Sequence, residues 1–225
     1  MNILIIHGDH TIKSYERFQE LIKKSKEKGW EIIRVSADEK FNISERLSSR
    51  SLFASKLLFV LDDYKKITVK DFSFFNKNND RLDGFLVVYS GSALSKTALN
   101  KLPKGYKTEE FIIPKLIWKF FESIYPNNAK LCINLLREVI KKEPVEFIFH
   151  LLARHLRDLY WVSIDPKGIG YQPWRVNKLK NQASRFRPGI LEKFIKSLAE
   201  LDVKVKTSQE NLTQALDFVI ASHLE

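Results

Sequence analysis

The sequence predicts an α/β domain built on a parallel sheet, followed by an all-helical domain. In the first part of the chain, short apolar runs alternate with helical stretches, which is typical of strands covered by helices. From residue 114 onward, apolar residues recur at spacings of three and four, which is the period of amphipathic helices. We therefore expect two domains, over residues 1–110 and 114–225.

Four strands are expected in the N-terminal domain, with helices between them. The first of them, NILIIH, is apolar throughout, which indicates a strand buried on both faces of the sheet. Gly29 is well placed to end the helix that follows it. The predicted strands are Asn2–His7, Trp30–Val35, Leu57–Leu61 and Phe85–Tyr89, and the predicted helices are Thr11–Lys28 and Ile43–Ser49.

Six helices are expected in the C-terminal domain. Prolines 114, 144, 173 and 188 are placed where a first-turn residue belongs, so they start helices rather than break them. A loop containing Pro166, Gly168 and Gly170 separates the third helix from the fourth. The expected helices are Lys115–Ile124, Ala129–Lys141, Pro144–Val162, Pro173–Phe186, Pro188–Lys204 and Gln209–His223.

Composition excludes several classes of protein. The 225 residues are 44% hydrophobic, which is enough for a core, and 12% aromatic, which argues against a disordered chain. The single cysteine, Cys132, excludes a disulfide framework. The sequence shows neither an apolar stretch of membrane-spanning length nor a signal peptide, so we expect a cytoplasmic protein that does not enter a membrane. The net charge of +11 favours a polyanionic partner.

The turn after the first strand occupies the position of a phosphate-binding loop. Such a loop needs G-x-x-x-x-G-K-[ST], but Lys13-Ser14 follows Gly8 one residue too early, and Ile12 replaces the second glycine. Asp62-Asp63, at the end of the third strand, resembles a magnesium-binding strand end only superficially. We favour an ordinary strand–turn–helix with an Asp or Thr cap over an ATPase.

No catalytic constellation is apparent in the sequence. The five histidines are scattered, and His150 and His155 are five residues apart, which does not suit two metal ligands on one helix. No nucleophile elbow or paired-carboxylate motif occurs. We expect neither enzymatic activity, nor a cofactor, nor a bound metal.

One candidate interaction segment is Arg50-Ser51-Leu52-Phe53, which precedes the third strand. An adjacent Leu-Phe pair in a polar setting can form an exposed hydrophobic wedge that fills a partner's pocket. The alternative is that Leu52 and Phe53 pack beneath the sheet, and the pattern alone favours that alternative.

A second candidate is the window Pro166–Leu191, which contains six basic residues and no acidic one. Aromatic residues are interleaved with the charges, as in surfaces that hold a phosphate backbone. A solvated helix face whose aromatic residues belong to the core explains the pattern equally well. The candidate nucleic-acid contacts are Arg175, Lys178, Lys180 and Arg185.

Several stretches, taken in order, resemble the delta subunit of the bacterial DNA polymerase III clamp loader. The opening ILIIHGD, the segment RSLFASKLLFVLDD and the stretch GSALSKTALNKL match the family's N-terminal part. EPVEFIFHLLARHLRDLYWV resembles its E-P-x-x-x-L-x-x-L-A-R-x-x-R-x-L helix. The most specific matches are QPWRVNKLKNQASRF and LEKFIKSLAELDVKVKTS, which resemble its P-[FW]-x-V-x-K-L-x-x-Q-A-x-x-F and L-x-x-x-D-x-x-x-K-T blocks.

This resemblance implies an AAA+-like N-terminal domain with a degenerate P-loop and a helical collar domain that joins the loader subunits. It implies that Leu52 and Phe53 insert into the beta sliding clamp and favour its opening, with Arg50 where the family often has an apolar residue. The implied partners are the clamp, the gamma/tau and delta prime-like ATPase subunits, and primed DNA as part of the complex. The resemblance reverses the preference for a buried Leu52-Phe53 pair and makes DNA contact by the basic window a minor hypothesis.

The sequence departs from the family between its two domains. A full delta subunit has a small helical lid there, whereas here GFLVVYSG is followed by the collar within about 25 residues. We therefore expect a reduced delta subunit without most of the lid. The alternative function is a basic nucleic-acid-binding protein that acts without the clamp.

Overall fold

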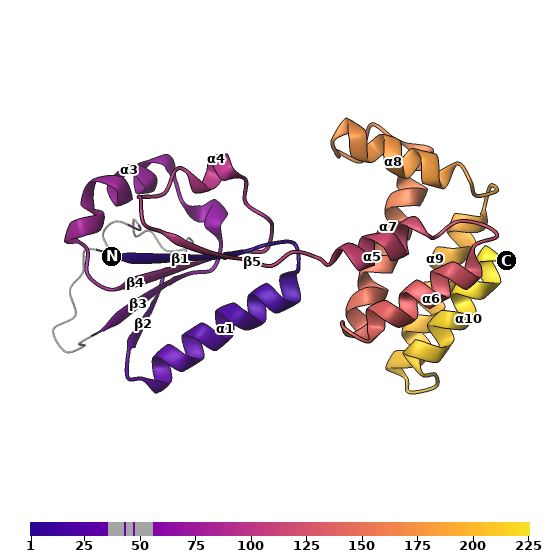
Figure 1. Cartoon of the computed structure of the whole chain (residues 1–225), viewed down its shortest axis with the longest axis horizontal. Helices are drawn as coiled ribbons and strands as arrows, with labels where there is room; N and C mark the ends of the chain where they lie inside the picture. Colours follow the sequence, from indigo (N-terminus) through magenta and orange to yellow (C-terminus); the bar gives the residue numbers. More distant parts are fainter. Residues whose placement is uncertain (36–42, 44–46, 48–55) are drawn as a thin grey trace. The chain divides into compact units, whose positions relative to one another are not determined.

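The computed structural model describes residues 1–35, 43, 47 and 56–225, and these form two compact units, Met1–Ile113 and Pro114–Glu225 (Figure 1). Each unit is described by itself below. The fold class agrees with the sequence prediction, because the first unit contains a parallel sheet with helices and the second is helical. Within the described residues, no helix combines the length and the hydropathy needed to cross a membrane.

The N-terminal unit is built on a five-stranded sheet in the order β2-β3-β4-β1-β5, and all neighbouring strands are parallel. In the β1–β4 pair, the register places Ile3 opposite Leu86 and Ile5 opposite Val88. Four of these strands confirm the apolar runs predicted from sequence. The strands are β1 (Asn2–His7), β2 (Glu31–Arg34), β3 (Leu57–Leu61), β4 (Phe85–Ser90) and β5 (Lys107–Glu110).

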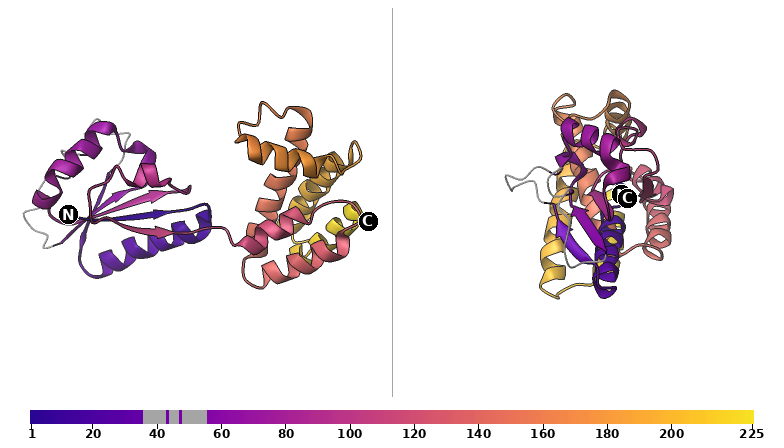
Figure 2. Two further views of the ribbon diagram at one scale, coloured as in Figure 1. Left: turned by 45° about the horizontal axis from the view of Figure 1, so that its top comes forward. Right: turned by 90° about the vertical axis from the view of Figure 1, so that its left-hand side faces the viewer.

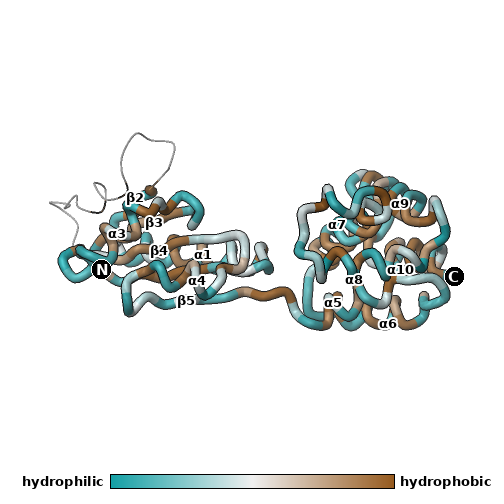
Figure 3. The backbone as a smooth tube through the Cα atoms, turned by 90° about the horizontal axis from the view of Figure 1, so that it is seen from above, coloured by the Kyte–Doolittle hydropathy of each residue, from teal (hydrophilic) through white to brown (hydrophobic). Residues whose placement is uncertain are grey.

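Strand β5 was not predicted from the sequence. Its residues, KTEE, are all polar, and Figure 3 shows it as hydrophilic beside the apolar strands. It pairs with β1 at the edge of the sheet, where a strand does not have to be buried on both faces. The polar stretch Lys107–Glu110 therefore belongs to the sheet of the N-terminal unit.

Helices cover both faces of the sheet (Figure 2). The helix α1 (Thr11–Glu27) packs Phe18 against one face, which includes Ile6, Val60 and Val87. The opposite face packs against α3 (Val69–Asn78) and α4 (Lys96–Leu99), with Phe75 fully buried. Two 3-10 helices, Tyr64–Lys66 and Asn79–Arg81, flank α3. Burial on both faces explains why the central strands are continuously apolar.

Helix α3 was also not predicted, although the sequence carries its start signal. The Thr68 hydroxyl accepts from the amide of Asp71 at 3.3 Å, and the Asp71 carboxylate accepts from the amide of Thr68 at 2.8 Å. This reciprocal pair is a capping box. In the predicted helix 43–49, only residues 43 and 47 are among those described, and both Ile43 and Leu47 are buried in the core.

The C-terminal unit contains the six helices expected from the sequence, with ends shifted by a few residues. Pro173 is the first residue of its helix, as predicted, but Pro114 and Pro144 lie one position earlier, as N-caps. Pro188 precedes the capping residue Gly189. The helices are α5 (Lys115–Glu122), α6 (Ala129–Ile140), α7 (Val145–Ile164), α8 (Pro173–Ala183), α9 (Ile190–Lys206) and α10 (Leu212–Leu224).

Gly8 allows the chain that leaves β5 to approach the end of β1. Its φ is +140°, and a β-carbon at this position would lie 1.9 Å from the carbonyl oxygen of Phe111. Gly29, which follows α1, has a φ of +74° with no heavy atom within 4 Å of such a β-carbon. The first glycine is therefore required by both backbone conformation and space, and the second by conformation alone.

We expect Gly8→Ala to lower the free energy of unfolding of the N-terminal unit by roughly 3 kcal/mol or more, because strain and a backbone clash combine. Gly29→Ala is the matched control and should cost about 1 kcal/mol. Urea denaturation, with amide hydrogen exchange in the sheet as the probe of this unit, measures both. Equal losses in the two variants would contradict the close approach of Phe111.

Candidate functional site

The turn between β1 and α1 is covered by backbone from the same unit. The amide of His10 donates to the carbonyl of Phe111 at 3.0 Å, and the amide of Phe111 donates to the carbonyl of His7 at 2.8 Å. The carboxylate of Asp9 accepts from the amide of Ile113 at 2.7 Å. In a phosphate-binding turn, the amides following the strand point at the ligand instead. This turn thus uses the position of a P-loop to hold the chain beyond β5.

The cap of α1 differs from the expected Asp or Thr. His10, which is buried, caps the helix, and its Nδ1 accepts from the amide of Lys13 at 3.4 Å. Asp9, one residue before the cap, accepts from the amide of Ile113 instead. Sequence reasoning missed His10 because histidine is not among the residues that usually cap helices.

His7 ends β1 at the carboxyl edge of the sheet, where ligands of open α/β sheets usually bind. Its ring is buried, and Nδ1 accepts from the amide of Leu94 at 3.3 Å. Burial lowers the pKa of His7 and outweighs the opposing effect of Glu110. A neutral ring that accepts from backbone fits a structural role, so the edge beside β1 is filled by the loop that follows β4.

Asp62 and Asp63 both have partners in the local structure. Asp63 caps the 3-10 helix by accepting from the amide of Lys65 at 2.9 Å, and Asp62 pairs with Lys66 at 3.1 Å. In the part of the chain that the structure describes, no group of three or more His, Cys, Asp or Glu side chains could hold a metal ion.

The predicted clamp-contacting residues Arg50, Ser51, Leu52 and Phe53 lie outside the described residues, as does the alternative in which the Leu-Phe pair packs beneath the sheet. The described residues on either side are Leu47, which is buried, and Lys56, which precedes β3.

Two of the four predicted nucleic-acid contacts, Arg175 and Lys178, lie on α8 and form ion pairs with carboxylates of the C-terminal unit. Arg175 lies 3.5 Å from the carboxylate of Asp158 and stacks over the ring of Tyr171, with its guanidinium carbon 3.9 Å from the ring centroid. Lys178 forms an ion pair with Glu122. Asp158 is buried and also accepts from the Tyr171 hydroxyl at 2.8 Å. Arg175 thus has the structural role of holding the loop before α8 against α7.

The other two candidates, Arg185 and Lys180, have different surroundings from each other. Arg185 follows α8 and lies over the ring of Tyr125, 4.8 Å from its centroid. Lys180 lines an open pocket of about 510 Å³ together with Arg187. The structure therefore does not gather the four predicted residues into one cationic surface.

Gln182 fixes the position of α8 in the helical unit. Its side-chain amide donates to the carbonyls of Phe121 and Ile124 at 2.7 and 2.9 Å, and its oxygen faces Nε2 of His155 at 3.2 Å. The His155 ring stacks on Phe121, with centroids 5.0 Å apart. Burial lowers the pKa of His155 to about 4, although the negative charge of Asp158 acts to raise this pKa. One amide thus connects α8, α7 and the end of α5.

Residues 115–223 match the family model of the DNA polymerase III delta subunit, C-terminal domain, so the helical unit is delta-subunit-like. The delta-subunit resemblance seen in the sequence is thereby confirmed for the helical unit. No curated protein matches the sequence. Between β4 and α5, the structure contains only α4 and β5, so no lid domain lies there.

Solved structures similar to this chain include clamp-loader proteins. The Bacillus subtilis DNA clamp loader delta protein is 12% identical, with a TM-score of 0.44 over 99% of this chain and 95% of that one. A DNA polymerase III gamma subunit-related protein from Thermotoga maritima is 13% identical, with a TM-score of 0.34 over 99% and 93%. Drosophila ORC bound to DNA and Cdc6 is 12% identical, with a TM-score of 0.35 over 88% and 46%.

We expect Mg-ATP to leave the melting temperature of the N-terminal unit unchanged, because Phe111 occupies the amide of His10 and covers the turn. Binding at a hundred times its dissociation constant would add about 2.7 kcal/mol, which a thermal shift resolves easily. Magnesium chloride without nucleotide is the control. A stabilisation that requires the nucleotide would contradict this reading of the turn.

We expect the C-terminal unit to lose stability as the pH falls from about 6.5 towards about 4. The unfolded chain protonates His155 at its ordinary pKa of 6.5, whereas the folded unit keeps it neutral down to a pKa of about 4. His155→Gln, which retains an amide facing Gln182, should flatten this part of the pH dependence. Urea unfolding at pH 7.5, 6 and 5 measures it, with tryptophan fluorescence as the probe because Trp118, Trp161 and Trp174 belong to this unit. Parallel profiles for variant and wild type would contradict the assignment.

Proposed function

We propose, from the match of residues 115–223 to the family model of the DNA polymerase III delta subunit, that this chain is a clamp-loader subunit of the delta type. It binds the beta sliding clamp and favours the open ring during loading onto primed DNA. That family match is the observation that carries the proposal. A C-terminal unit of this family implies that the helices from α5 onward join the chain to the other loader subunits.

The arrangement of the N-terminal unit supports a role without ATP hydrolysis. The turn in which a phosphate would be bound holds Phe111 instead, so the energy of the loading cycle would come from gamma/tau and delta prime-like partner subunits. This chain would contribute binding energy to one state of the clamp. Such binding shifts a conformational equilibrium only by its difference in affinity for the two states.

Leu52 and Phe53 are the side chains that we propose insert into the clamp. Burying one such apolar side chain stabilises a complex by about 1.5–3 kcal/mol, so two of them supply the energy of an interface hot spot. In the sequence, the segment lies between the buried Leu47 and strand β3. Arg50, at the leading position, would add little to an apolar contact.

We expect Leu52→Ala combined with Phe53→Ala to weaken binding of the clamp from the same organism by at least about 100-fold. The circular dichroism spectrum should not change. Val69→Ala is the matched control, because Val69 is also apolar, belongs to the same unit and is 80% exposed. Size-exclusion chromatography and surface plasmon resonance with the full chain measure the effect, and wild-type affinity of the double variant would refute the proposed contact.

The alternative function, nucleic-acid binding without the clamp through Arg175, Lys178, Lys180 and Arg185, is less well supported by the structure. Arg175 and Lys178 are held by carboxylates of the same unit, which leaves fewer charges for an external phosphate.

A further inference from the structure

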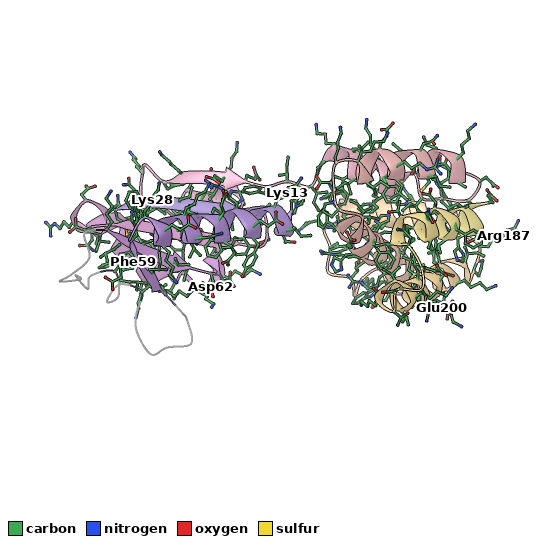
Figure 4. All side chains as sticks on the ribbon, turned by 90° about the horizontal axis from the view of Figure 1, so that it is seen from below. Lys13, Lys28, Phe59, Asp62, Arg187 and Glu200 are labelled. Carbon is green, nitrogen blue, oxygen red and sulfur yellow. The ribbon has the colours of Figure 1, made fainter. Side chains whose placement is uncertain are left out.

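One face of the sheet in the N-terminal unit is covered by a single helix of the described residues. Right-handed crossovers place connections that move in opposite directions along a parallel sheet on opposite faces. In the order β2-β3-β4-β1-β5, the connection through α1 moves from β1 towards β2, whereas those through α3 and α4 move towards β5. Ile43 and Leu47, between β2 and β3, are buried on the side of α3 and α4 as well. Figure 4 looks onto the face of α1, with Lys13 and Lys28 labelled near the two ends of the helix.

Helix α1 leaves one corner of this face uncovered. Five strands spaced by about 4.8 Å make a sheet about 19 Å wide, whereas a helix with its side chains is about 10–12 Å across. α1 starts after the carboxyl end of β1 and ends before the amino end of β2, so it runs away from the corner where β1, β4 and β5 begin. A pocket of about 370 Å³ lies there, within the size range of small-molecule sites. Its lining includes Asn2, Leu4, Leu21, Trp30, Phe85 and Lys107.

Two aromatic rings form an apolar wall of this pocket. The rings of Trp30 and Phe85 contact each other, with centroids 4.8 Å apart and an angle of 34° between their planes. Phe85 is nevertheless 38% exposed, although it belongs to β4, the central strand of the sheet. Its ring therefore keeps an open surface on which a flat apolar group can pack.

The charged groups of the pocket leave one cation without a carboxylate. Glu109 also lines the pocket, but Arg17 donates to both of its oxygens, at 2.6 and 2.9 Å. Lys107 is exposed and forms no ion pair among the described residues. Asn2 lies two residues before Leu4 on the same face of β1, and Leu4 pairs with Lys107. In the described part of the chain, the Asn2 side chain has no hydrogen-bond partner, so an ammonium and an amide are available at this end of the pocket.

We propose that this pocket binds a small aromatic carboxylate. The ring of the ligand packs against Phe85 and Trp30, and its carboxylate accepts from the Lys107 ammonium and the Asn2 amide. β1 separates β4 from β5, so the two ends of the pocket lie about 10 Å apart, the length of a two-ring aromatic acid. An acid fits better than a neutral ligand because the fold supplies no carboxylate for Lys107. A small ligand fits better than a protein because α1 and the sheet bound the pocket.

This inference goes beyond the clamp-loader proposal and does not depend on it. The pocket uses no residue of the segment 50–53 and none of the helical unit. Failure to bind an aromatic acid would leave the proposed clamp contact untouched, and failure to bind the clamp would leave the pocket untouched. The full chain alone is sufficient for the test.

NMR titration of the ¹⁵N-labelled full chain with 2-naphthoate tests the proposal. Trp30 is the one tryptophan of the N-terminal unit, so its indole N–H signal, assigned with Trp30→Phe, reports on the pocket. The other three tryptophans, Trp118, Trp161 and Trp174, report on the helical unit. We expect a saturable shift of the Trp30 signal alone. No shift of that signal at millimolar ligand, or equal shifts of every indole signal, would overturn the site.

Lys107→Gln separates the contribution of charge from that of apolar contact. It should weaken binding of 2-naphthoate about fivefold, the upper end for an exposed ion pair, and leave binding of the neutral 2-naphthalenemethanol unchanged. Lys96→Gln is the matched control, because Lys96 is an exposed lysine of α4, on the opposite face of the sheet. It should change neither affinity. Equal weakening of the two ligands by Lys107→Gln, or the same effect from Lys96→Gln, would overturn the proposed ionic contact.

Asn2→Phe tests the place of binding. Asn2 lies opposite Phe85 in the β1–β4 register, so the new ring should fill the pocket and abolish binding of both ligands. Circular dichroism and thermal unfolding verify that the variant is folded, and wild-type affinity of the folded variant would overturn the site. The two lysine variants alter only exposed side chains, so they decide the proposal even where Asn2→Phe does not fold.

Discussion

The hydrogen bonds between the β1–α1 turn and the chain leaving β5 are the constraint on which the N-terminal unit depends. His7, Asp9 and His10 each bond to the segment 111–113, and Gly8 leaves the space for its backbone. The bond from the amide of Phe111 to the carbonyl of His7 continues the pairing of β5 with β1. The bond from the amide of His10 to the carbonyl of Phe111 occupies one amide at the position of a phosphate-binding turn. The same few atoms thus hold the end of the last strand and cover the turn after β1.

The helical unit is organised around a comparable set of polar contacts. Gln182 donates to two carbonyls at the end of α5. The buried Asp158 accepts hydrogen bonds from Tyr171 and Arg157 and forms an ion pair with Arg175. Leaving any of these buried groups unpaired would cost more than the net gain of a typical hydrogen bond, so they specify one orientation of α8. That orientation leaves Trp174 exposed and places Lys180 among the residues that line a pocket.

The two units divide the proposed task in a physically consistent way. A subunit that hydrolyses no nucleotide can still influence a ring that opens, provided it binds the open form more tightly. In the proposed function, Leu52 and Phe53 would provide such binding energy without charge, and the helical unit would attach the chain to partners that hydrolyse ATP. The net charge of +11 would then be a background that suits work beside DNA, with specificity in a few side chains.

The sequence by itself determined the elements whose signal is hydrophobic: four apolar strands, the helix after the first of them, and six helices with periods of three and four. It also determined the family of the helical unit, through the blocks around residues 172–186 and 191–208. Only the tertiary structure decided what depends on distant partners. Strand β5 is polar and pairs with β1 at the edge of the sheet. His10 caps α1, while the preceding Asp9 accepts from the distant amide of Ile113. The sequence does not show which carboxylates pair with Arg175 and Lys178, because Asp158 and Glu122 approach them only when α5, α7 and α8 pack. The hydrophobic period of a helix or strand depends on residues that are neighbours in the sequence. The partner of a polar side chain depends on groups that only folding brings close to it.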